Sequence, residues 1–271
     1  MINKLSILMG AYNCASTLPQ TLDSLINQTF SNFVCYICDD GSKDDTLNVI
    51  KGYCAKDSRF VLLQNEVNMG LSRALNKCIQ VTNTDFAARM DGDDIAEPDR
   101  FEKQIKFLEE NPQIDFCGSA MRYFDNNGFW GEHIYPEYPK SKDFLYTSPY
   151  SHPTVMFRTS SLLKMKDING NVYSEDKKIG RSEDYDLFMR MHAAGLKGYN
   201  FQISLLQYRE DADCFAKRKF KYAITEARVR YRGYKSLKLL PKGFVYVIKP
   251  IIVSLVPKTL RRKLHKKQYK K

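Results

Sequence analysis

The chain has 271 residues, enough for one α/β domain and a tail but too few for two enzyme domains. Its 43% hydrophobic content excludes disorder for most of its length, and seven scattered cysteines without a disulfide-scaffold spacing indicate a reducing cytoplasm. The net charge of +11 is uneven: residues 217–271 carry nineteen Lys and Arg and one acidic residue, which leaves 23 basic and 30 acidic residues before them. That acidic body excludes a general nucleic-acid-binding domain, whereas the basic tail suits nucleic acid or an anionic membrane surface.

Apolar runs alternate with helical periodicity through the first hundred residues. The run Leu5–Met9 is too short for a signal peptide and predicts a first strand, and a helix with Ser16 as its N-cap follows. Apolar runs at 33–38, 60–63 and 85–90 predict three more strands, with helices between them at 47–54 and 72–81. This order predicts right-handed βαβ units and a mostly parallel sheet, which binds its ligand beyond the carboxyl ends of the strands.

Two acidic turns end two of these strands. The turn Asp91-Gly92-Asp93-Asp94 follows the fourth strand, and a second acidic turn at 39–42 follows the second, so we expect both at one edge of the sheet. Asp91 and Asp93 have the oxygen ligands that Mg²⁺ or Mn²⁺ prefers, and such a cation neutralises a diphosphate leaving group. The alternative is a helix-entry loop in which Asp93 or Asp94 is a cap.

The turn Asp39-Asp40-Gly41-Ser42 has two compatible interpretations. A carboxylate at a strand end accepts hydrogen bonds from the N–H groups of a base, and Gly41 permits a close turn. Ser42 with Asp45 also resembles a capping box. We predict that Ser42 caps the next helix while Asp39 or Asp40 faces the ligand.

The pattern from 113 to 210 is less regular, with Pro- and Tyr-rich turns and one strong helix, Glu183–Ala194. We predict one catalytic domain, residues 1–212, whose nucleotide-sugar half ends near residue 112 and whose acceptor half is 113–212. His152 lies in the loop Tyr150-Ser-His-Pro-Thr before an apolar strand. It is a candidate contact of the diphosphate or the acceptor, and the alternative is a structural loop histidine.

Five motifs in consistent order over residues 3–210 resemble glycosyltransferase family 2. They are Ile7-Leu-Met-Gly-Ala-Tyr-Asn13, Asp39-Asp-Gly-Ser42, Asn68-x-Gly-Leu-Ser-x-Ala-Leu-Asn76, Ala88-Arg-Met-Asp-x-Asp-Asp94 and Glu183-Asp-Tyr-Asp-Leu187. The resemblance implies the GT-A fold, a Rossmann-like α/β sheet flanked by helices. It also implies an inverting, non-processive transferase of the kind that builds bacterial polysaccharides.

The resemblance assigns the donor contacts. It implies that Tyr12 lies against the nucleobase and that Asp39 or Asp40 hydrogen-bonds it. Arg73, inside the third motif, and His152 are the further residues that we expect to contact the nucleotide sugar.

The resemblance also assigns the cation and the base. It implies that Asp91 and Asp93 handle the ribose and the metal-bound diphosphate, with Mn²⁺ or Mg²⁺ as the cofactor, and that Asp184 is the catalytic base. An inverting transfer needs one carboxylate to take the acceptor's proton, and the start of a helix favours the charged form. The alternative is that Asp184 and its neighbours are ordinary helix N-terminal charges.

Three departures from the family pattern bear on function. Gly10 stands where many relatives have proline, which should loosen the turn. Tyr208-Arg-Glu-Asp211 lacks the histidine that completes many metal sites, so the third protein ligand stays open. The Gln-x-x-Arg-Trp motif of processive synthases is absent and the single tryptophan is Trp130, so transfer of one sugar is favoured.

Residues 213–271 are predicted to form a basic amphipathic helical tail. The stretch 244–256 is apolar but interrupted by Lys249 and Pro250, and it is shorter than the roughly 20 residues of a spanning helix. It resembles an interfacial anchor, which predicts a cytoplasmic enzyme bound peripherally to the inner face of the cytoplasmic membrane. The alternative is a helix that packs on the catalytic domain.

The prediction is a hexosyl- or N-acetylhexosaminyl-transferase that moves one sugar from a nucleotide diphosphate sugar, expected to be a UDP-sugar. The acceptor is a hydroxyl of a surface glycan or lipid-linked precursor, and no nucleic-acid partner is expected. A sugar-phosphate nucleotidyltransferase would carry a basic Gly-rich loop after the first strand, where this chain has Gly10-Ala-Tyr-Asn-Cys14. A nucleic-acid-binding protein using the tail would leave the acidic turns unexplained.

Overall fold

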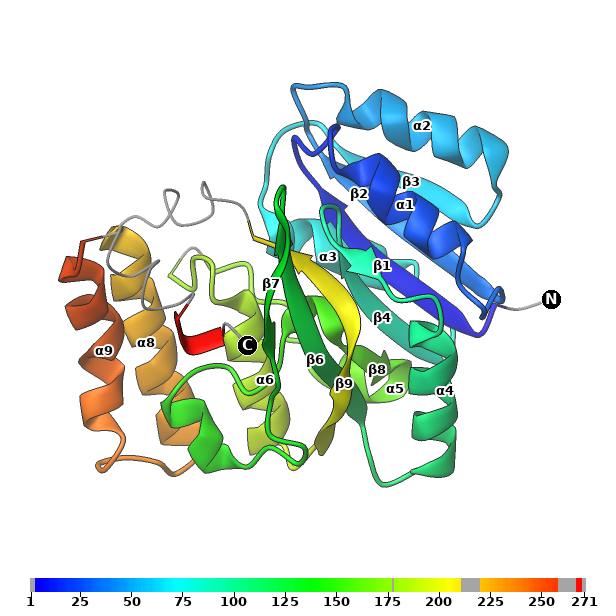
Figure 1. Ribbon diagram of the computed structural model, residues 1–271. Helices are drawn as coiled ribbons and strands as arrows, with labels where there is room; N and C mark the ends of the chain where they lie inside the picture. The colour runs from blue at the N-terminus through cyan, green and yellow to red at the C-terminus, as the bar shows by residue number, and fades with distance from the viewer. Residues whose placement is uncertain (1–2, 177, 211–219, 258–266, 270–271) are drawn as a thin grey trace.

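The computed structural model describes residues 3–176, 178–210, 220–257 and 267–269. Nine strands of these residues form one sheet in the order β3-β2-β1-β4-β8-β6-β9-β5, with β7 paired to β6 (Figure 1). Helices cover both faces of this sheet.

The first half is the predicted series of βαβ units. Its strands are β1 (Leu5–Ala11), β2 (Phe33–Asp40), β3 (Phe60–Asn65) and β4 (Phe86–Asp91), and all of their pairings are parallel. The helices are α1 (Leu18–Ile26), α2 (Thr46–Lys56), α3 (Leu71–Gln80) and α4 (Arg100–Glu110). The predicted strands and helices of this half are confirmed, although Thr17, and not Ser16, is the N-cap of α1.

The second half is a mixed sheet. Its strands are β5 (Ile95–Ala96), β6 (Phe116–Asp125), β7 (Gly128–His133), β8 (Met156–Arg158) and β9 (Gly198–Arg209). The helical segments are η1 (Ser141–Leu145), η2 (His152–Thr154), α5 (Thr159–Leu163) and α6 (Glu183–Ala193). Strand β8 pairs antiparallel with both β4 and β6, so it joins the two halves into one sheet.

The alternation of side chains along the strands separates two buried clusters. In β1, Leu5, Ile7 and Met9 face a cluster shared with α1, α2 and α4, whereas Leu8 faces a cluster shared with α3 and α6. Both faces of β1 are therefore buried, as in a parallel sheet covered on two sides. This burial places the ligand edge at the ends of the strands.

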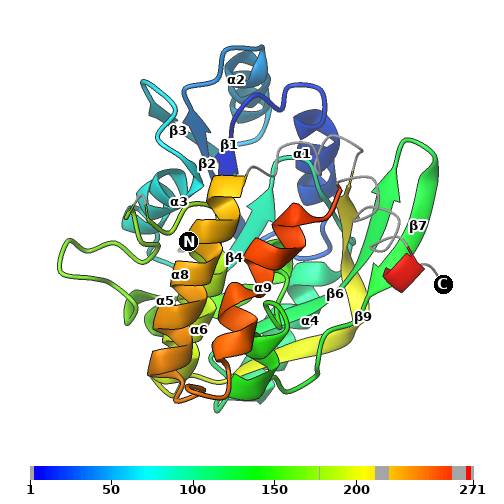
Figure 2. The ribbon, with the colours of Figure 1, turned by 90° about the vertical axis from the view of Figure 1, so that its left-hand side faces the viewer.

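Two helices follow the sheet in the C-terminal region, α8 (Phe220–Ser236) and α9 (Phe244–Leu255), and they lie side by side next to α6 (Figure 2). Val229 and Tyr234 of α8 are buried in the cluster that contains α6, and the Met189 side chain packs against Gly233. Helix α8 therefore packs on the body. None of the helices in the described ranges is long and apolar enough to cross a membrane.

Candidate active site

The register of the parallel strands brings the two acidic turns together. Gly10 of β1 pairs with Asp91 of β4, and the next residue, Ala11, pairs with Asp39 of β2. Asp39 and Asp91 thus flank the end of the same central strand. The prediction that both turns lie at one edge of the sheet is confirmed.

The two carboxylates of the first turn have different environments. Both Asp40 oxygens are engaged: Oδ1 accepts bonds from the Asn65 side chain (2.8 Å) and the Met69 N–H (2.9 Å), and Oδ2 accepts the Gly70 N–H (2.8 Å). Asp40 therefore anchors the turn that leads into α3. Asp39 Oδ1 is buried and has no hydrogen-bond partner among the described residues.

The predicted cap at Ser42 is wrong. The Ser42 hydroxyl accepts the Asn13 N–H (3.1 Å), so it ties this turn to the loop after β1. The N-cap residue of α2 is Asp45, and the Asp44 carboxylate accepts the Thr46 N–H (3.0 Å). Ser42 links the two loops because the loop after β1 lies against this turn.

The loop after β1 carries Tyr12, which is 45% exposed at the rim of this edge. Gly10 before it lies tightly against α3: a Cβ there would approach Leu71 Cδ1 to 2.7 Å and Ala74 Cβ to 3.3 Å. The expectation that Gly10 merely loosens the turn is therefore incomplete. The glycine lets α3 pack closely against the end of β1.

Three carboxylates gather beyond β4. Oxygens of Asp91, Asp93 and Asp94 all lie within 4.8 Å of one another. Neither Asp93 nor Asp94 caps a helix, because β5 begins at Ile95 and the N-cap of α4 is Asp99. The helix-cap interpretation is wrong.

Asp94 is a site residue that the sequence prediction missed. It is fully buried, and its Oδ1 accepts the Arg209 N–H (3.0 Å). Its buried Oδ2 has no hydrogen-bond partner within the part of the chain that the structure describes. A buried carboxylate oxygen of this kind needs a partner, and a divalent cation between Asp91, Asp93 and Asp94 would supply one. The donor set fits Mg²⁺ or Mn²⁺.

Burial and mutual repulsion raise the pKa values of this acidic cluster. The pKa of Asp93 is raised to about 6, chiefly by burial and then by the Asp91 charge. The pKa of Asp94 is raised well above its ordinary value for the same reasons. Carboxylates held this close favour a divalent cation, which removes the repulsion.

A buried cation, Arg89, compensates part of this negative charge. It is 2% exposed and forms an ion pair with Asp91. Burial is the largest single effect on the Arg89 pKa and lowers it, but the charge and hydrogen bond of Asp91, together with the charges of Tyr173 and Asp94, keep that pKa above its ordinary value. The same guanidinium lowers the pKa values of Asp93 and Asp184, so it lies within electrostatic reach of both.

Asp184 stands in the first turn of α6, half-buried, with its Oδ1 accepting the Tyr185 N–H (2.7 Å). Burial raises its pKa, and Arg89 opposes that rise. Its neighbour Glu183 is buried, and burial together with the Asp184 charge raises the Glu183 pKa to about 7. Asp91 contributes to that rise, so the start of α6 and the acidic cluster share one electrostatic site around Arg89.

The third acid of that turn has a structural role. Asp186 accepts bonds from Arg190 (2.7 Å) on its own helix and from Arg232 (3.1 Å) on α8. Both Asp186 oxygens are therefore engaged. Asp186 therefore holds α6 against α8.

His152 is buried in η2, and its Nε2 lies 2.7 Å from the Tyr173 hydroxyl. Burial, reinforced by the Arg89 charge, holds the pKa of His152 well below its ordinary value, so the ring is neutral. Tyr173 is in turn held by Asn76 of α3, whose Oδ1 accepts the Tyr173 N–H (2.9 Å). The motif residue Asn76 therefore positions the partner of His152.

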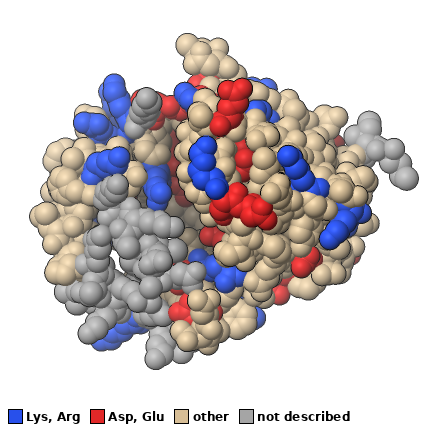
Figure 3. Space-filling model, turned by 90° about the horizontal axis from the view of Figure 1, so that it is seen from above, with Lys and Arg blue, Asp and Glu red and all other residues tan. Residues whose placement is uncertain are grey.

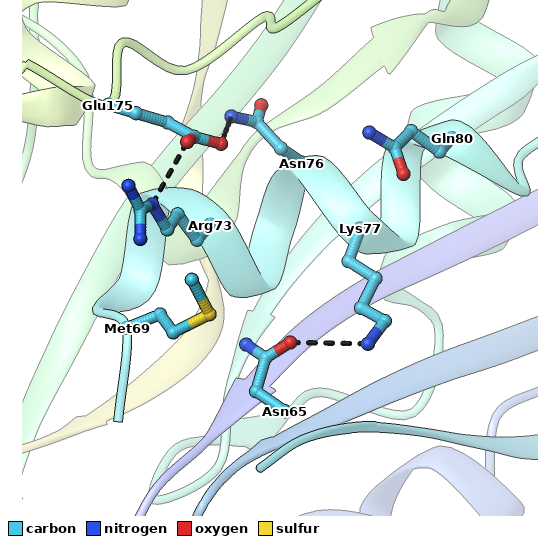
Figure 4. A pocket seen from close by; sticks show the side chains of 7 residues that line it. All are labelled: Asn65, Met69, Arg73, Asn76, Lys77, Gln80 and Glu175. Carbon is cyan, nitrogen blue, oxygen red and sulfur yellow. Dashed lines mark hydrogen bonds and ion pairs between the residues drawn. The ribbon is translucent and has the colours of Figure 1, made fainter. Parts of the chain in front are cut away.

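Arg73 lines a polar pocket on α3, between the end of β3 and the loop that contains Glu175 (Figure 4). Its Nε donates to Glu175 (2.9 Å), which also accepts a bond from Asn76 (3.1 Å). On the opposite side Lys77 donates to Asn65 (3.2 Å). The pocket joins α3 to the turn that Asp40 anchors.

The prediction left the third protein ligand of the cation open at residues 208–211, which follow along the end of β9 as far as the structure describes them. The Arg209 N–H bonds Asp94, and its side chain reaches the Asp93 carbonyl (3.0 Å). Glu210 is buried, and Asp211 lies outside the described residues. Seen from above, red acidic atoms gather near the middle of the molecule, and blue basic atoms lie in the middle and on both sides of it (Figure 3).

Comparison with known proteins gives a consistent assignment. The family model described as Glycosyl transferase family 2 matches residues 6–168. The chain is 37% identical to the putative glycosyltransferase EpsE of Bacillus subtilis, over 98% of this chain and 94% of that protein. It is 30% identical to a UDP-Gal:α-D-GlcNAc-diphosphoundecaprenol β-1,3-galactosyltransferase of Escherichia coli, over 97% and 96% of the two chains.

Solved structures share the fold. TarS 1–349 of S. aureus in complex with UDP-GlcNAc superposes with a TM-score of 0.71 at 18% identity, over 92% of this chain and 71% of that one. The mannosyltransferase PcManGT from Pyrobaculum calidifontis in complex with GDP-Man and Mn²⁺ has a TM-score of 0.65 at 12% identity, over 97% and 79%. The predicted GT-A fold is confirmed, and neither alternative function receives support from these comparisons.

Proposed function

Because the chain belongs to glycosyltransferase family 2, we propose that it is an inverting enzyme that transfers one sugar from a UDP-sugar to an acceptor hydroxyl. The observation that carries this proposal is the site around Arg89, where a three-carboxylate cluster and a single catalytic carboxylate, Asp184, meet. The acceptor is a surface-glycan or lipid-linked precursor. Two observations support the substrates: the E. coli relative is named for UDP-Gal and a diphosphoundecaprenol-linked sugar, and TarS binds UDP-GlcNAc.

The donor base lies at the end of β2 in this proposal. Asp39 Oδ1 is the buried acceptor with no partner among the described residues, so it receives the base N–H, while Asp40 holds the turn in place. The exposed Tyr12 ring covers the base from the rim. Arg73 and His152 remain the further donor contacts that we propose.

Asp91, Asp93 and Asp94 would hold Mn²⁺ or Mg²⁺. Such a cation would supply positive charge to neutralise the diphosphate leaving group. Arg89 holds the Asp91 side chain in place through their ion pair.

Asp184 accepts the proton of the acceptor hydroxyl. The acceptor oxygen then forms its bond to the anomeric carbon from the face opposite the bond that breaks to the diphosphate, which inverts the configuration. The N-terminal position of Asp184 in α6 favours its carboxylate form, and Arg89 does so as well. Asp186 accepts hydrogen bonds from Arg190 and Arg232, and these bonds hold the helix that carries Asp184.

Nucleotide binding provides the test. In the presence of Mn²⁺, UDP at one hundred times its Kd is expected to stabilise the protein by about 2.7 kcal/mol, while GDP and ADP do so less. For a chain of this size that corresponds to a Tm increase of about 5–10 °C. The measurement is a thermal melt with a panel of nucleotides, with and without Mn²⁺.

Asp93→Asn is expected to abolish the Mn²⁺-dependent part of this shift without weakening the metal-free protein. Because the folded-state pKa of Asp93 is raised to about 6, its ionisation costs stability as pH rises through that value. The variant should therefore be at least as stable as wild type above that pH. Glu110→Gln, at an exposed acid on α4, is the control. No shift with any nucleotide–metal pair would overturn the proposal.

We further propose that α9 binds the enzyme to the inner face of the cytoplasmic membrane. Its outward side carries a stripe of exposed apolar side chains, namely Phe244, Val245, Ile248, Ile252 and Leu255. The basic residues Lys242 and Lys249 flank this stripe and are exposed. A stripe of this composition suits an anionic lipid surface.

The double variant Phe244→Ser/Ile252→Ser is expected to lower binding to phosphatidylglycerol-containing vesicles by about tenfold or more, because two apolar side chains no longer insert. Cosedimentation measures it, and added salt should weaken wild-type binding. We choose point variants over deletion of the tail, because deletion would remove α8 and expose the apolar surface on which it packs. Ile168→Ser, at a fully exposed isoleucine in another loop, is the matched control. Equal binding by the double variant and wild type would refute membrane insertion by α9.

A further inference from the structure

Aromatic side chains from β6, β7, β9 and the residues after β7 form one cluster, in which Tyr123 and Tyr135 are buried. The aromatic platform consists of Tyr123, Trp130, His133, Tyr135 and Tyr208. Tyr123 stacks on Trp130 (ring centroids 4.6 Å apart, 13°), and His133 stacks on Tyr135 (4.0 Å, 26°). The strand registers place Tyr208 beside Tyr123 and His133 beside Met121, two residues away, so these side chains share one face.

The aromatic platform lies between the two parts of the proposed active site. Its Tyr208 precedes Arg209, whose N–H bonds the Asp94 carboxylate. At the other end, Met121, which is buried in the same cluster as Tyr123 and Tyr135, accepts a hydrogen bond from the hydroxyl of Ser151 (3.0 Å), the residue before His152. A sugar bound on these rings would therefore lie beside residues of the proposed active site.

A ring from the far end of the chain covers the aromatic platform. Tyr269 lies 4.4 Å from His133 and 5.6 Å from Tyr123, measured between ring centroids. Figures 1 and 2 both show this short C-terminal segment beside β7. A Cβ at Gly131 would approach the Tyr269 carbonyl oxygen to 2.6 Å, so only glycine at that position permits the backbone of the cover to come so close.

We propose that the aromatic platform binds a sugar ring of the acceptor and that Tyr269 occupies that place until the acceptor displaces it. The proposal rests on the transferase function given above. The apolar C–H face of a pyranose packs on the electron-rich faces of aromatic rings, while its hydroxyls are bound by polar groups at the rim such as Glu132. A tyrosine ring is a flat substitute of similar size, and it keeps the apolar rings from water when no acceptor is present.

The single tryptophan makes this testable without turnover. Trp130 is in the aromatic platform, so all tryptophan fluorescence of the protein reports on this site. Tyr269→Ala and Gly131→Ala are both expected to increase quenching of Trp130 by acrylamide in the absence of any ligand. Gly52→Ala, where an added Cβ meets nothing, is the matched control and should leave quenching unchanged. Unchanged quenching in both cover variants would overturn the inference that Tyr269 is a cover.

Acceptor binding is then measured by titrating Trp130 fluorescence with N-acetylglucosamine linked through an α-diphosphate to a short lipid. Removal of the cover is expected to lower the Kd several-fold in Tyr269→Ala and Gly131→Ala, since the acceptor no longer competes with an internal ring. His133→Ala should raise the Kd. A Kd that is unchanged or higher in Tyr269→Ala would refute displacement of Tyr269 by the acceptor.

Activity separates this inference from the proposed function. In the wild type and both cover variants, kcat and the KM for the UDP-sugar should agree, and only the KM for the acceptor should fall. Absence of transfer in all of them overturns the proposed function, while the fluorescence titration still decides whether the aromatic platform binds a sugar. If transfer occurs and the acceptor KM is the same in the wild type and the variants, only the inference that Tyr269 is a cover is overturned.

Discussion

Asp184→Asn is expected to lower kcat about 1,000-fold, because it removes the carboxylate that accepts the acceptor's proton. UDP and Mn²⁺ should still raise the Tm as in wild type, since none of the proposed donor and metal contacts lies on α6. The measurement is steady-state transfer of a radiolabelled sugar from the UDP-sugar, beside the thermal melt. An unchanged kcat would place the base elsewhere, with the neighbouring Glu183 as the next candidate.

The pH dependence of kcat gives this prediction a second readout. Burial raises the pKa of Asp184, so the wild-type kcat should fall as pH decreases through a value above the ordinary aspartate range. That limb should vanish in Asp184→Asn, whose amide does not titrate. Asp186→Asn on the same helix is the matched control, because both Asp186 oxygens hold arginines. It should cost stability and keep the wild-type pH limb.

Arg89→Met is expected to destabilise the metal-free protein by about 3–5 kcal/mol, because it leaves a group of buried carboxylates without their cation. For a protein of this size that corresponds to a Tm decrease of about 10 °C. Binding of Mn²⁺ and UDP should recover part of the loss, since the cation neutralises the same carboxylates. Melts with and without Mn²⁺ measure both effects.

The loss in Arg89→Met should also depend on pH in a defined direction. The pKa values of Asp93 and Glu183 are raised to about 6 and about 7 in the folded protein. The folded protein is therefore favoured while these two groups are protonated, and its stability falls as the pH rises through these values. Arg89 opposes both rises. The difference from wild type should therefore grow from pH 5 toward pH 8, where roughly all these carboxylates are charged.

Arg158→Met is the matched control for that pH series. Arg158 donates to the backbone carbonyls of Ile114 and Asn111 and has no carboxylate partner among the described residues. Its removal should cost stability equally at every pH in the series. A pH-independent loss in Arg89→Met as well would show that the guanidinium does not offset the acidic cluster.

The sequence was sufficient for the local elements and the edge that carries chemistry. Period-2 and period-3.6 apolar patterns are local properties, so β1 to β4 and the helices between them could be predicted within a residue or two. Parallel strands place their carboxyl ends together whatever the details of packing. The meeting of Asp39 and Asp91 therefore followed from topology alone.

Individual side-chain roles depended on contacts distant in sequence. Asp39 and Asp40 are adjacent and chemically identical, and only the fold of residues 65–70 around Asp40 distinguishes them. The sequence suggested that Ser42 caps a helix, but its hydroxyl accepts a hydrogen bond from the loop after β1 instead. Asp94 resembled a cap too, because nothing local indicates that β9 would bury it.

What the sequence by itself determined was the family, the order of the elements and the acids at the strand ends, because periodicity and motif order lie within one stretch of chain. The tertiary structure alone decided which carboxylates are open and which are bonded, and that Arg89 lies near both the acidic cluster and Asp184. It also decided that Tyr269 covers Tyr123 and His133, which lie more than a hundred residues earlier in the chain. Burial and hydrogen bonding are properties of neighbours in space. A local pattern specifies an element's own conformation but not the partner that will pack on it.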